Sequence, residues 1–316
     1  MTTVATAAMI AAMRDALQAI LGPVSEPILL AGGASKEAWA VDAGGERLLV
    51  RRAALTVIHR HTLSLRDEFE MLQAAYEAGV KVPRPVQYIA DLDGREAFVM
   101  ERLEGETIGR RIVRMNLPED LPLQLADELA KIHAIPSARV PFLGAAQIDR
   151  MVDELDEVDE PHPAIELGLW WLRENRPPER ERVVVHGDFR IGNVVVDEHG
   201  LVGVLDWEFA HLDDPARDLA FGLVRAWRFG VPEKRLGGIG DVEPYLERYN
   251  ELTGFDVTPG ELDYWELAGN AAWAIGCLTQ AQRHLTGQER SVELAILGRL
   301  GVEVEYEICN LLERAA

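Results

Sequence analysis

The sequence has few of the features that mark disulfide-rich, metal-cluster or membrane proteins. It contains only two cysteines, Cys277 and Cys309, and they form neither a CxxC pair nor a metal-ligand spacing. We therefore expect two free thiols and a cytoplasmic location, where thiols stay reduced. No apolar run approaches the roughly 18 residues that cross a bilayer, and no basic residues precede the apolar stretch at the N-terminus. Neither a membrane partner nor a signal peptide is expected.

Basic residues are also scarce. The 32 Lys and Arg residues face 53 Asp and Glu residues, which gives a formal net charge of −21. Nucleic acids are bound through basic patches that neutralise phosphates, so a nucleic acid is excluded as a main partner. The acidic surplus fits a cationic substrate or simple solubility, and solubility is the commoner cause. The apolar fraction of 48% over 316 residues predicts a globular protein of two modest domains or one large one.

The sequence also lacks repeats and low-complexity tracts. It contains no G-x-x-x-x-G-K-[ST] loop, which excludes a P-loop protein. A change of pattern along the chain is present instead. After an amphipathic helix from Ile10 to Leu21, the stretch Ile28–Val50 predicts strands with tight turns, and Ser64–Ala78 predicts a helix. Helical periodicity then dominates over residues 121–135, 166–174, 218–229, 243–252, 261–283 and 291–313. The chain is therefore expected to be α+β, with a small sheet first and helices second.

Polar residues sit at the ends of apolar runs between Val183 and Glu208. Val194–Val196 and Leu201–Leu205 flank a turn-type cluster and predict a β-hairpin. Asn193 precedes the first arm and Asp206 follows the second, so the hairpin brings them side by side. An amide oxygen beside a carboxylate suits Mg²⁺. Each residue alone reads as a turn cap, but the arrangement favours a metal site.

Asp188 lies in the loop that leads to this hairpin. The segment HGDFRIGN fits H-x-D-x-x-x-x-N, the pattern of a phosphotransferase catalytic loop. Asp188 can orient an acceptor hydroxyl and accept its proton, while Asn193 and Asp206 hold the Mg²⁺ that neutralises nucleotide phosphates. Arg51, at the end of a strand in the first part, is placed to steady those phosphates.

On HGDFRIGN, and on LDWE thirteen residues beyond its Asn, the sequence resembles the aminoglycoside phosphotransferase and choline kinase-like family. It looks most like the branch with an HGDFRxGN loop and a DWE motif, over roughly residues 28–285. The resemblance implies a two-lobed, protein-kinase-like fold. Residues 1–102 would form the nucleotide-binding lobe, with a small antiparallel sheet and one main helix. Residues 103–316 would form the larger helical lobe with the catalytic loop and the acceptor site.

The family assigns roles to the motif residues. Asp188 would be the catalytic base, and Asn193 and Asp206 would be the Mg²⁺ ligands. Glu68 would be the helix glutamate that pairs with the phosphate-binding cation, with Glu70 as the alternative register.

Two further segments match the family. The segment VMERLEG resembles the hinge where the backbone meets adenine, which puts Met100 and Arg102 beside the nucleotide. In LDDPARDLA, Asp218 would brace the catalytic loop, as would His186.

Two positions depart from the kinase pattern. Arg51 stands where protein kinases carry Lys, and it offers a fork in place of a point donor. Strand alternation from Leu49 favours Arg51, but Arg52 stays open as the phosphate-binding cation. The glycine-rich turn is AGGASKE. Its residues Gly32, Gly33 and Ser35 can cover phosphates through backbone N–H groups, although an ordinary hairpin turn explains them equally well.

Arg190 is either a second catalytic cation, which neutralises the moving phosphoryl group, or a partner in a surface salt bridge.

The acceptor would be a small-molecule hydroxyl held by residues 137–182 and the last helices. The acidic run Asp153–Glu160 is more typical of a solvated surface than of a site for a polycationic sugar. Four tryptophans, Trp170, Trp171, Trp265 and Trp273, are more typical of a core than of a pocket lining. ATP and GTP stay equally open, and the sequence indicates no oligomeric state. A non-catalytic nucleotide-binding protein is the alternative function.

Overall fold

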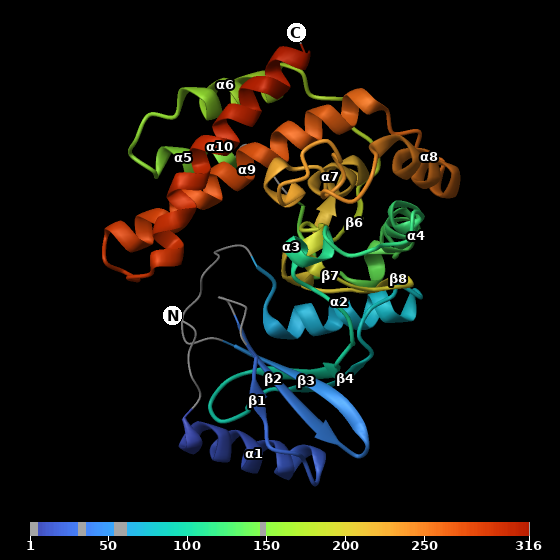
Figure 1. The fold of residues 1–316 in the computed structure, drawn as a ribbon, viewed down its shortest axis with the longest axis vertical. Coiled ribbons are helices and arrows are strands. Elements are labelled where there is room, and N and C mark those ends of the chain that lie inside the picture. The colour runs from blue at the N-terminus through green and yellow to red at the C-terminus, as the bar shows by residue number, and fades with distance from the viewer. Residues whose placement is uncertain (1–5, 31–35, 54–61, 146–149, 316) are drawn as a thin grey trace.

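We describe the protein from a computed structural model that covers residues 6–30, 36–53, 62–145 and 150–315. Within these ranges the chain forms a sheet with two helices, followed by a larger, mostly helical part (Figure 1). The predicted α+β class is confirmed. None of the helices in the described ranges is both long and apolar enough to cross a membrane.

The first part contains a five-stranded antiparallel sheet in the order β1-β2-β3-β5-β4. Its elements are α1 (Ala7–Leu21), β1 (Ile28–Leu29), β2 (Lys36–Ala43), β3 (Glu46–Ala53), α2 (Leu65–Glu77), β4 (Pro85–Ile89) and β5 (Ala97–Glu101). Helix α1 covers one face of the sheet and α2 lies on the other, toward the helical part (Figure 1).

Alternation along the strands decides which side chains meet each helix. Met13 and Leu17 of α1 are buried against Trp39 and Val50 in one apolar cluster. On the opposite face, α2 packs through Phe69, whose ring lies 5.7 Å from that of Phe98 on β5. Because period-2 alternation separates neighbours in a strand, adjacent residues of β2 and β3 serve different faces.

The second part is built from helices and two short pairs of strands. Its elements are α3 (Gly109–Ile112), α4 (Leu121–His133), α5 (Arg150–Asp156), α6 (Pro163–Glu174), β6 (Val183–Val185), β7 (Val194–Asp197), β8 (Gly200–Val204), β9 (His211–Asp213), α7 (Pro215–Phe221), α8 (Val242–Thr253), α9 (Pro259–Leu285) and α10 (Val292–Ala315), with 3₁₀ turns at Ser137–Arg139, Ile191–Asn193, Trp207–Phe209 and Arg225–Arg228. The predicted hairpin is confirmed as β7–β8, whose register pairs Asp197 with Gly200.

One predicted helix is wrong in its extent. The periodic pattern indicated a helix over residues 218–229, but α7 ends at Phe221 and a 3₁₀ turn follows at Arg225–Arg228. Phe229 then adopts a left-handed backbone with φ of 42°, which an α-helix does not accommodate. The apolar side chains of this stretch are buried by a turn, so their spacing resembles that of a helix.

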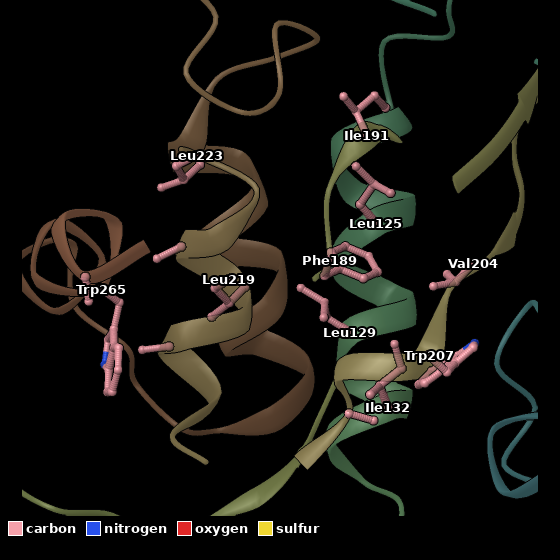
Figure 2. Packing of buried hydrophobic residues seen from close by; sticks show 14 of the residues in the cluster. Leu125, Leu129, Ile132, Phe189, Ile191, Val204, Trp207, Leu219, Leu223 and Trp265 are labelled. Atoms are coloured by element: carbon pink, nitrogen blue, oxygen red, sulfur yellow. The ribbon is translucent and has the colours of Figure 1, made fainter. Parts of the chain in front are cut away.

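The larger of the two apolar clusters anchors the loop between β6 and β7. Phe189 and Ile191 point from this loop into the core, beside Leu125 and Leu129 of α4 (Figure 2). Phe189 and Ile191 are each 3% exposed. Burying such side chains contributes about 1.5–3 kcal/mol each, so the loop that carries the polar residues of HGDFRIGN is held rigidly.

The two parts join after β5, where the chain passes close to the hairpin. Glu106 pairs with Val196 in an isolated bridge, and Gly105 precedes it with φ of 144°. A Cβ at Gly105 would lie 2.7 Å from the carbonyl oxygen of Val196. Only glycine allows this approach, which connects the sheet part to the hairpin.

Candidate active site

Asp218 holds the start of the loop between β6 and β7 through hydrogen bonds. It is fully buried, and its carboxylate accepts the backbone N–H groups of His186 (2.6 Å) and Gly187 (2.8 Å) and the Nε2 group of His133 (3.3 Å). Burial works against its charge, but the contacts with His133 and His186 lower the pKa of Asp218. Gly187 needs the turn that these bonds hold, since its φ is 80° and a Cβ would lie 2.2 Å from the Phe209 carbonyl oxygen.

His186 links this loop to the end of the hairpin. Its Nε2 lies 2.8 Å from the carbonyl oxygen of Leu205, and its Nδ1 accepts the backbone N–H of Asp188 at 3.2 Å. In this arrangement Nδ1 is the acceptor, and Nε2 is the ring nitrogen that can donate to Leu205. The ring also lies 4.7 Å from that of Trp207, so His186 is a buried, fully partnered support.

The side chain of Asp188 is oriented by two neighbours in its own loop. Arg190 donates through Nε to Oδ1 at 2.9 Å, and the amide nitrogen of Asn193 donates to Oδ2 and, at 3.0 Å, to the backbone oxygen. Burial raises the pKa of Asp188, although Arg190 favours the charged form. A carboxylate that is held in place and made more basic by burial is suited to accept a proton.

Arg190 is more than a surface cation. Its guanidinium carbon lies 4.2 Å from the ring centroid of Trp227, which is itself 5% exposed and lies 4.7 Å from Trp273. A guanidinium over an aromatic face is stabilised by the ring quadrupole. Arg190 therefore forms an ion pair with Asp188 and packs against the ring of Trp227, which holds the guanidinium in place.

Asp206 follows β8 in a left-handed conformation with φ of 64°, which is uncommon for a non-glycine residue. The neighbouring Leu205 donates its N–H to the carbonyl oxygen of Asn193 at 2.8 Å, so the hairpin does bring Asn193 and Asp206 together. Asp206 binds Arg51, whose Nη2 lies 2.6 Å from Oδ1. Burial disfavours its charge, but Arg51 and Lys36 lower the pKa of Asp206.

At this open end of the hairpin, one side-chain oxygen of Asn193 and one of Asp206 accept no hydrogen bond from the residues that the structure describes. The amide nitrogen of Asn193 is used by Asp188, so its oxygen is the atom left to bind a cation, and Asp206 keeps Oδ2. The described residues hold no cluster of three His, Cys, Asp or Glu side chains that could bind a metal. One amide and one carboxylate fit Mg²⁺, which is usually bound by few protein ligands plus phosphates and water.

The sheet separates the two candidate arginines. Arg51 pairs in register with Ala38 and Phe98, and its side chain reaches Asp206. Arg52 lies opposite Glu37, binds its carboxylate at 2.7 Å and lies over Trp39, on the α1 face. The placement favours Arg51 over Arg52 for the nucleotide side. Burial disfavours the charge of Arg51, but Asp206 and Glu68 raise its pKa.

Glu68 points inward from α2 and is 3% exposed, whereas Glu70 lies on the surface with Arg66. The direct partner of Glu68 is Lys36, which also donates to Glu208 at 2.7 Å. No ion pair joins Glu68 to Arg51 within the described residues, so the pairing of Glu68 with the phosphate-binding cation stays a prediction. Lys36 was missed because its segment reads as part of a turn, and its partners are far away in sequence. Burial raises the pKa of Glu68, although Lys36 and Arg51 oppose this.

Met100 and Arg102, the predicted hinge residues, already have contacts within the protein. Met100 is 6% exposed and belongs to the core cluster on the α2 face. The backbone N–H of Arg102 donates to the carbonyl oxygen of Arg47 at 2.9 Å, and its guanidinium pairs with Asp42 at 3.3 Å. The contacts of Met100 and Arg102 with a nucleotide stay predictions. Gly32, Gly33 and Ser35 lie outside the described residues.

A shallow depression borders the loop region on the side of α9. It is lined by Met151, Arg217, Phe221, Trp265, Ala268, Gly269 and Ala272. Phe221 lies 5.9 Å, ring to ring, from the Trp227 that supports Arg190. Trp170 is exposed, and of the four tryptophans singled out from the sequence Trp265 alone lines this depression.

The sheet part, the helical part and the loop between them define a two-lobed, protein-kinase-like fold. A crystal structure from Ralstonia eutropha assigned to the aminoglycoside phosphotransferases has a TM-score of 0.74 at 20% identity, and covers 97% of this chain and 98% of that chain. Spectinomycin phosphotransferase in complex with ADP and spectinomycin has a TM-score of 0.68 at 14% identity, and covers 93% and 97%. Both likenesses confirm the fold.

Residues 26–254, more than half of the chain, match the model of the phosphotransferase enzyme family, APH. The chain belongs to this family, as the resemblance on HGDFRIGN and LDWE implied.

The curated relatives include proteins with two different kinds of name. Human acyl-CoA dehydrogenase family member 11 is 28% identical over 239 residues, which cover 65% of this chain and 30% of that protein. The aminoglycoside 3'-phosphotransferase of Streptomyces ribosidificus is 28% identical over 208 residues, which cover 58% of this chain and 73% of that protein. The chain thus spans less than a third of the length of the human relative.

Proposed function

We propose that the protein is a Mg²⁺-dependent phosphotransferase that moves the γ-phosphoryl group of ATP or GTP to a hydroxyl of a small molecule. The observation that carries this proposal is the joining of Asp188, Asn193 and Asp206 at the open end of one hairpin, with Arg51 reaching the same place from the sheet. The division into a nucleotide-binding lobe of residues 1–102 and an acceptor-binding lobe of residues 103–316 is part of the same proposal.

Asp188 would orient the acceptor hydroxyl and accept its proton. Arg190 and Asn193 hold its two carboxylate oxygens, and burial raises its pKa. Arg190, which is supported by Trp227, brings a positive charge beside the base. That charge would stabilise the phosphoryl group as it moves.

Asn193 and Asp206 would hold Mg²⁺ through their free oxygens. A bound Mg²⁺ neutralises phosphate charge and fixes the geometry of the triphosphate. Arg51 has a further role on the nucleotide side, because its Nε is buried without a hydrogen-bond partner among the described residues. A buried donor without an acceptor is costly, and a phosphate oxygen would satisfy it.

We leave open whether ATP or GTP donates the phosphoryl group. Among the structural neighbours, spectinomycin phosphotransferase is described in complex with ADP, and aminoglycoside 2'-phosphotransferase-IIIa in complex with GDP.

The acceptor would lie on the side of the depression near α9, whose lining contains one charged residue, Arg217, and no carboxylate. Both cysteines are free, in agreement with the cytoplasmic location that we propose.

A non-catalytic nucleotide-binding protein is the second candidate, and one observation favours it. Arg51 occupies one oxygen of Asp206, the residue proposed to bind the metal. If this ion pair persisted with nucleotide present, Mg²⁺ would compete poorly for Asp206.

Asp188→Asn tests the proposal. We expect it to reduce acceptor-dependent release of ADP or GDP by about 10²- to 10⁴-fold, the range for loss of a general base. Nucleotide affinity should change little, because the role of Asp188 is in the transition state. The measurement is nucleoside diphosphate release with a panel of alcohols, sugars and amino alcohols, together with calorimetric nucleotide binding. Turnover by the wild type that persists in Asp188→Asn would show that the base is assigned wrongly.

A further inference from the structure

Lys36 is a buried cation to which the proposed mechanism gives no part. It begins β2, is 7% exposed, and lies on the α2 face of the sheet, as Arg51 does. Its ammonium donates to Glu68 of α2 and, at 2.7 Å, to Glu208, which stands two residues after Asp206. The contacts therefore connect the sheet, the main helix of the first part and the segment that follows the hairpin.

Lys36 belongs to a buried network of ion pairs. Within the described residues it pairs with Glu68 and Glu208, and Arg51 pairs with Asp206. Buried ion pairs of this kind rarely stabilise a fold more than apolar residues of similar size. A structural role alone is thus a weak reason for a buried lysine here.

The unused donors of the two cations point to a ligand with several oxygens. An ammonium has three donors, and two of those on Lys36 are taken by Glu68 and Glu208. Arg51 has the buried Nε, which finds no partner among the residues that the structure describes. Phosphate groups accept several such bonds at once, and the free oxygens of Asn193 and Asp206 are suited to the cation that accompanies them.

We propose that Lys36 is a phosphate-binding residue for a nucleoside di- or triphosphate, held in place by Glu68 and Glu208, and that Arg51 shares the task from β3. The inference rests on the proposed nucleotide-dependent function. In this proposal two residues share the phosphate-binding role that the family gives to one cation. Lys36 forms the ion pair with the helix glutamate Glu68, and Arg51 forms the ion pair with Asp206.

The test compares a nucleoside with its diphosphate. Calorimetry in Mg²⁺ measures the binding of ADP and adenosine, or GDP and guanosine, to the wild type, Lys36→Met and Lys36→Arg. Lys131→Met is the matched control, since Lys131 pairs with the buried Glu128 at 2.8 Å but lies on α4. We expect Lys36→Met to weaken diphosphate binding by about 10- to 100-fold, the size of a lost charge-assisted hydrogen bond. Nucleoside affinity should stay within about threefold, with partial rescue in Lys36→Arg and no effect in Lys131→Met.

Equal weakening of the nucleoside and the diphosphate, or an unchanged diphosphate affinity, would overturn the inference and leave Lys36 a structural residue. Absence of diphosphate binding by the wild type would instead overturn the proposed function itself. Lys36→Met leaves two buried carboxylates without their cation, which threatens folding. The double variant Lys36→Met/Glu68→Gln removes one of these charges, and it is compared with Glu68→Gln alone for the same difference between diphosphate and nucleoside.

Discussion

Replacing Asp218 by Asn tests how the loop between β6 and β7 is held. The two side chains have the same shape, so the substitution leaves no cavity. One carboxylate oxygen becomes an NH₂ group, which cannot accept a hydrogen bond. Placed at Oδ2, it would face the donors of His186 and His133, and placed at Oδ1 it would face the N–H of Gly187. Every orientation leaves at least one buried donor without an acceptor.

The cost follows from the cheaper orientation. Losing the acceptor of the Gly187 N–H costs about 1–3 kcal/mol. The two remaining bonds lose their charge assistance, which roughly halves their strength. We therefore expect Asp218→Asn to lower the free energy of unfolding by about 2–4 kcal/mol, a large share of the ~5–15 kcal/mol that is typical of folded proteins.

The effect has a defined pH dependence. The pKa of Asp218 is lowered in the folded protein, so its contribution is fully present above the ordinary Asp pKa of about 3.9. It is lost as the pH falls through the lower folded-state pKa. The difference between wild type and variant should therefore be constant near neutral pH and shrink in acid.

Urea unfolding followed by tryptophan fluorescence, near neutral pH and in acid, measures both quantities. Asp153→Asn, at an exposed position of α5, is the control and should change little. A loss below about 0.5 kcal/mol, the usual range for surface substitutions, would refute this account of the loop. A difference that grows on acidification would refute it as well.

Two other substitutions separate neighbouring roles. Arg52→Ala should lower the melting temperature, since it removes the ion pair with Glu37 and the contact with Trp39, but it should leave nucleotide affinity within about twofold. Arg51→Ala should weaken the binding of Mg-nucleotide, measured by calorimetry, by about 10-fold or more. The reverse pattern would assign the phosphate-binding role to Arg52. Trp227→Leu should lower kcat about 3- to 30-fold with little change in the KM for nucleotide, because it removes the ring beneath Arg190. A change confined to KM would contradict a positioning role for Trp227.

Short-range patterns were enough for the hairpin and the residues around it. The runs Val194–Val196 and Leu201–Leu205, with one turn between them, fix which residues meet at the open end. That is why Asn193 and Asp206 could be placed beside each other from spacing alone. The same strand alternation separated Arg51 from Arg52, and the structure puts them on opposite faces.

Contacts between distant segments could not be predicted in this way. Lys36 meets Glu68, 32 residues away, and Glu208, 172 residues away, and no local pattern encodes either pairing. Trp227 was missed as the support of Arg190 for the same reason. The depression lined by α7 and α9 likewise depends on how helices pack, so the acceptor was described from the sequence only as a hydroxyl compound.

The central claim is that a nucleotide binds together with Mg²⁺ at the open end of the hairpin. Thermal melts of the wild type and of Asp206→Ala, with ATP or GTP and Mg²⁺ and again in EDTA, test it most directly, because a ligand bound to the folded state raises the melting temperature. The account predicts a rise for the wild type with at least one nucleotide, its loss in EDTA, and little or no rise for Asp206→Ala. No rise with either nucleotide, or an equal rise in EDTA and in Asp206→Ala, would contradict it.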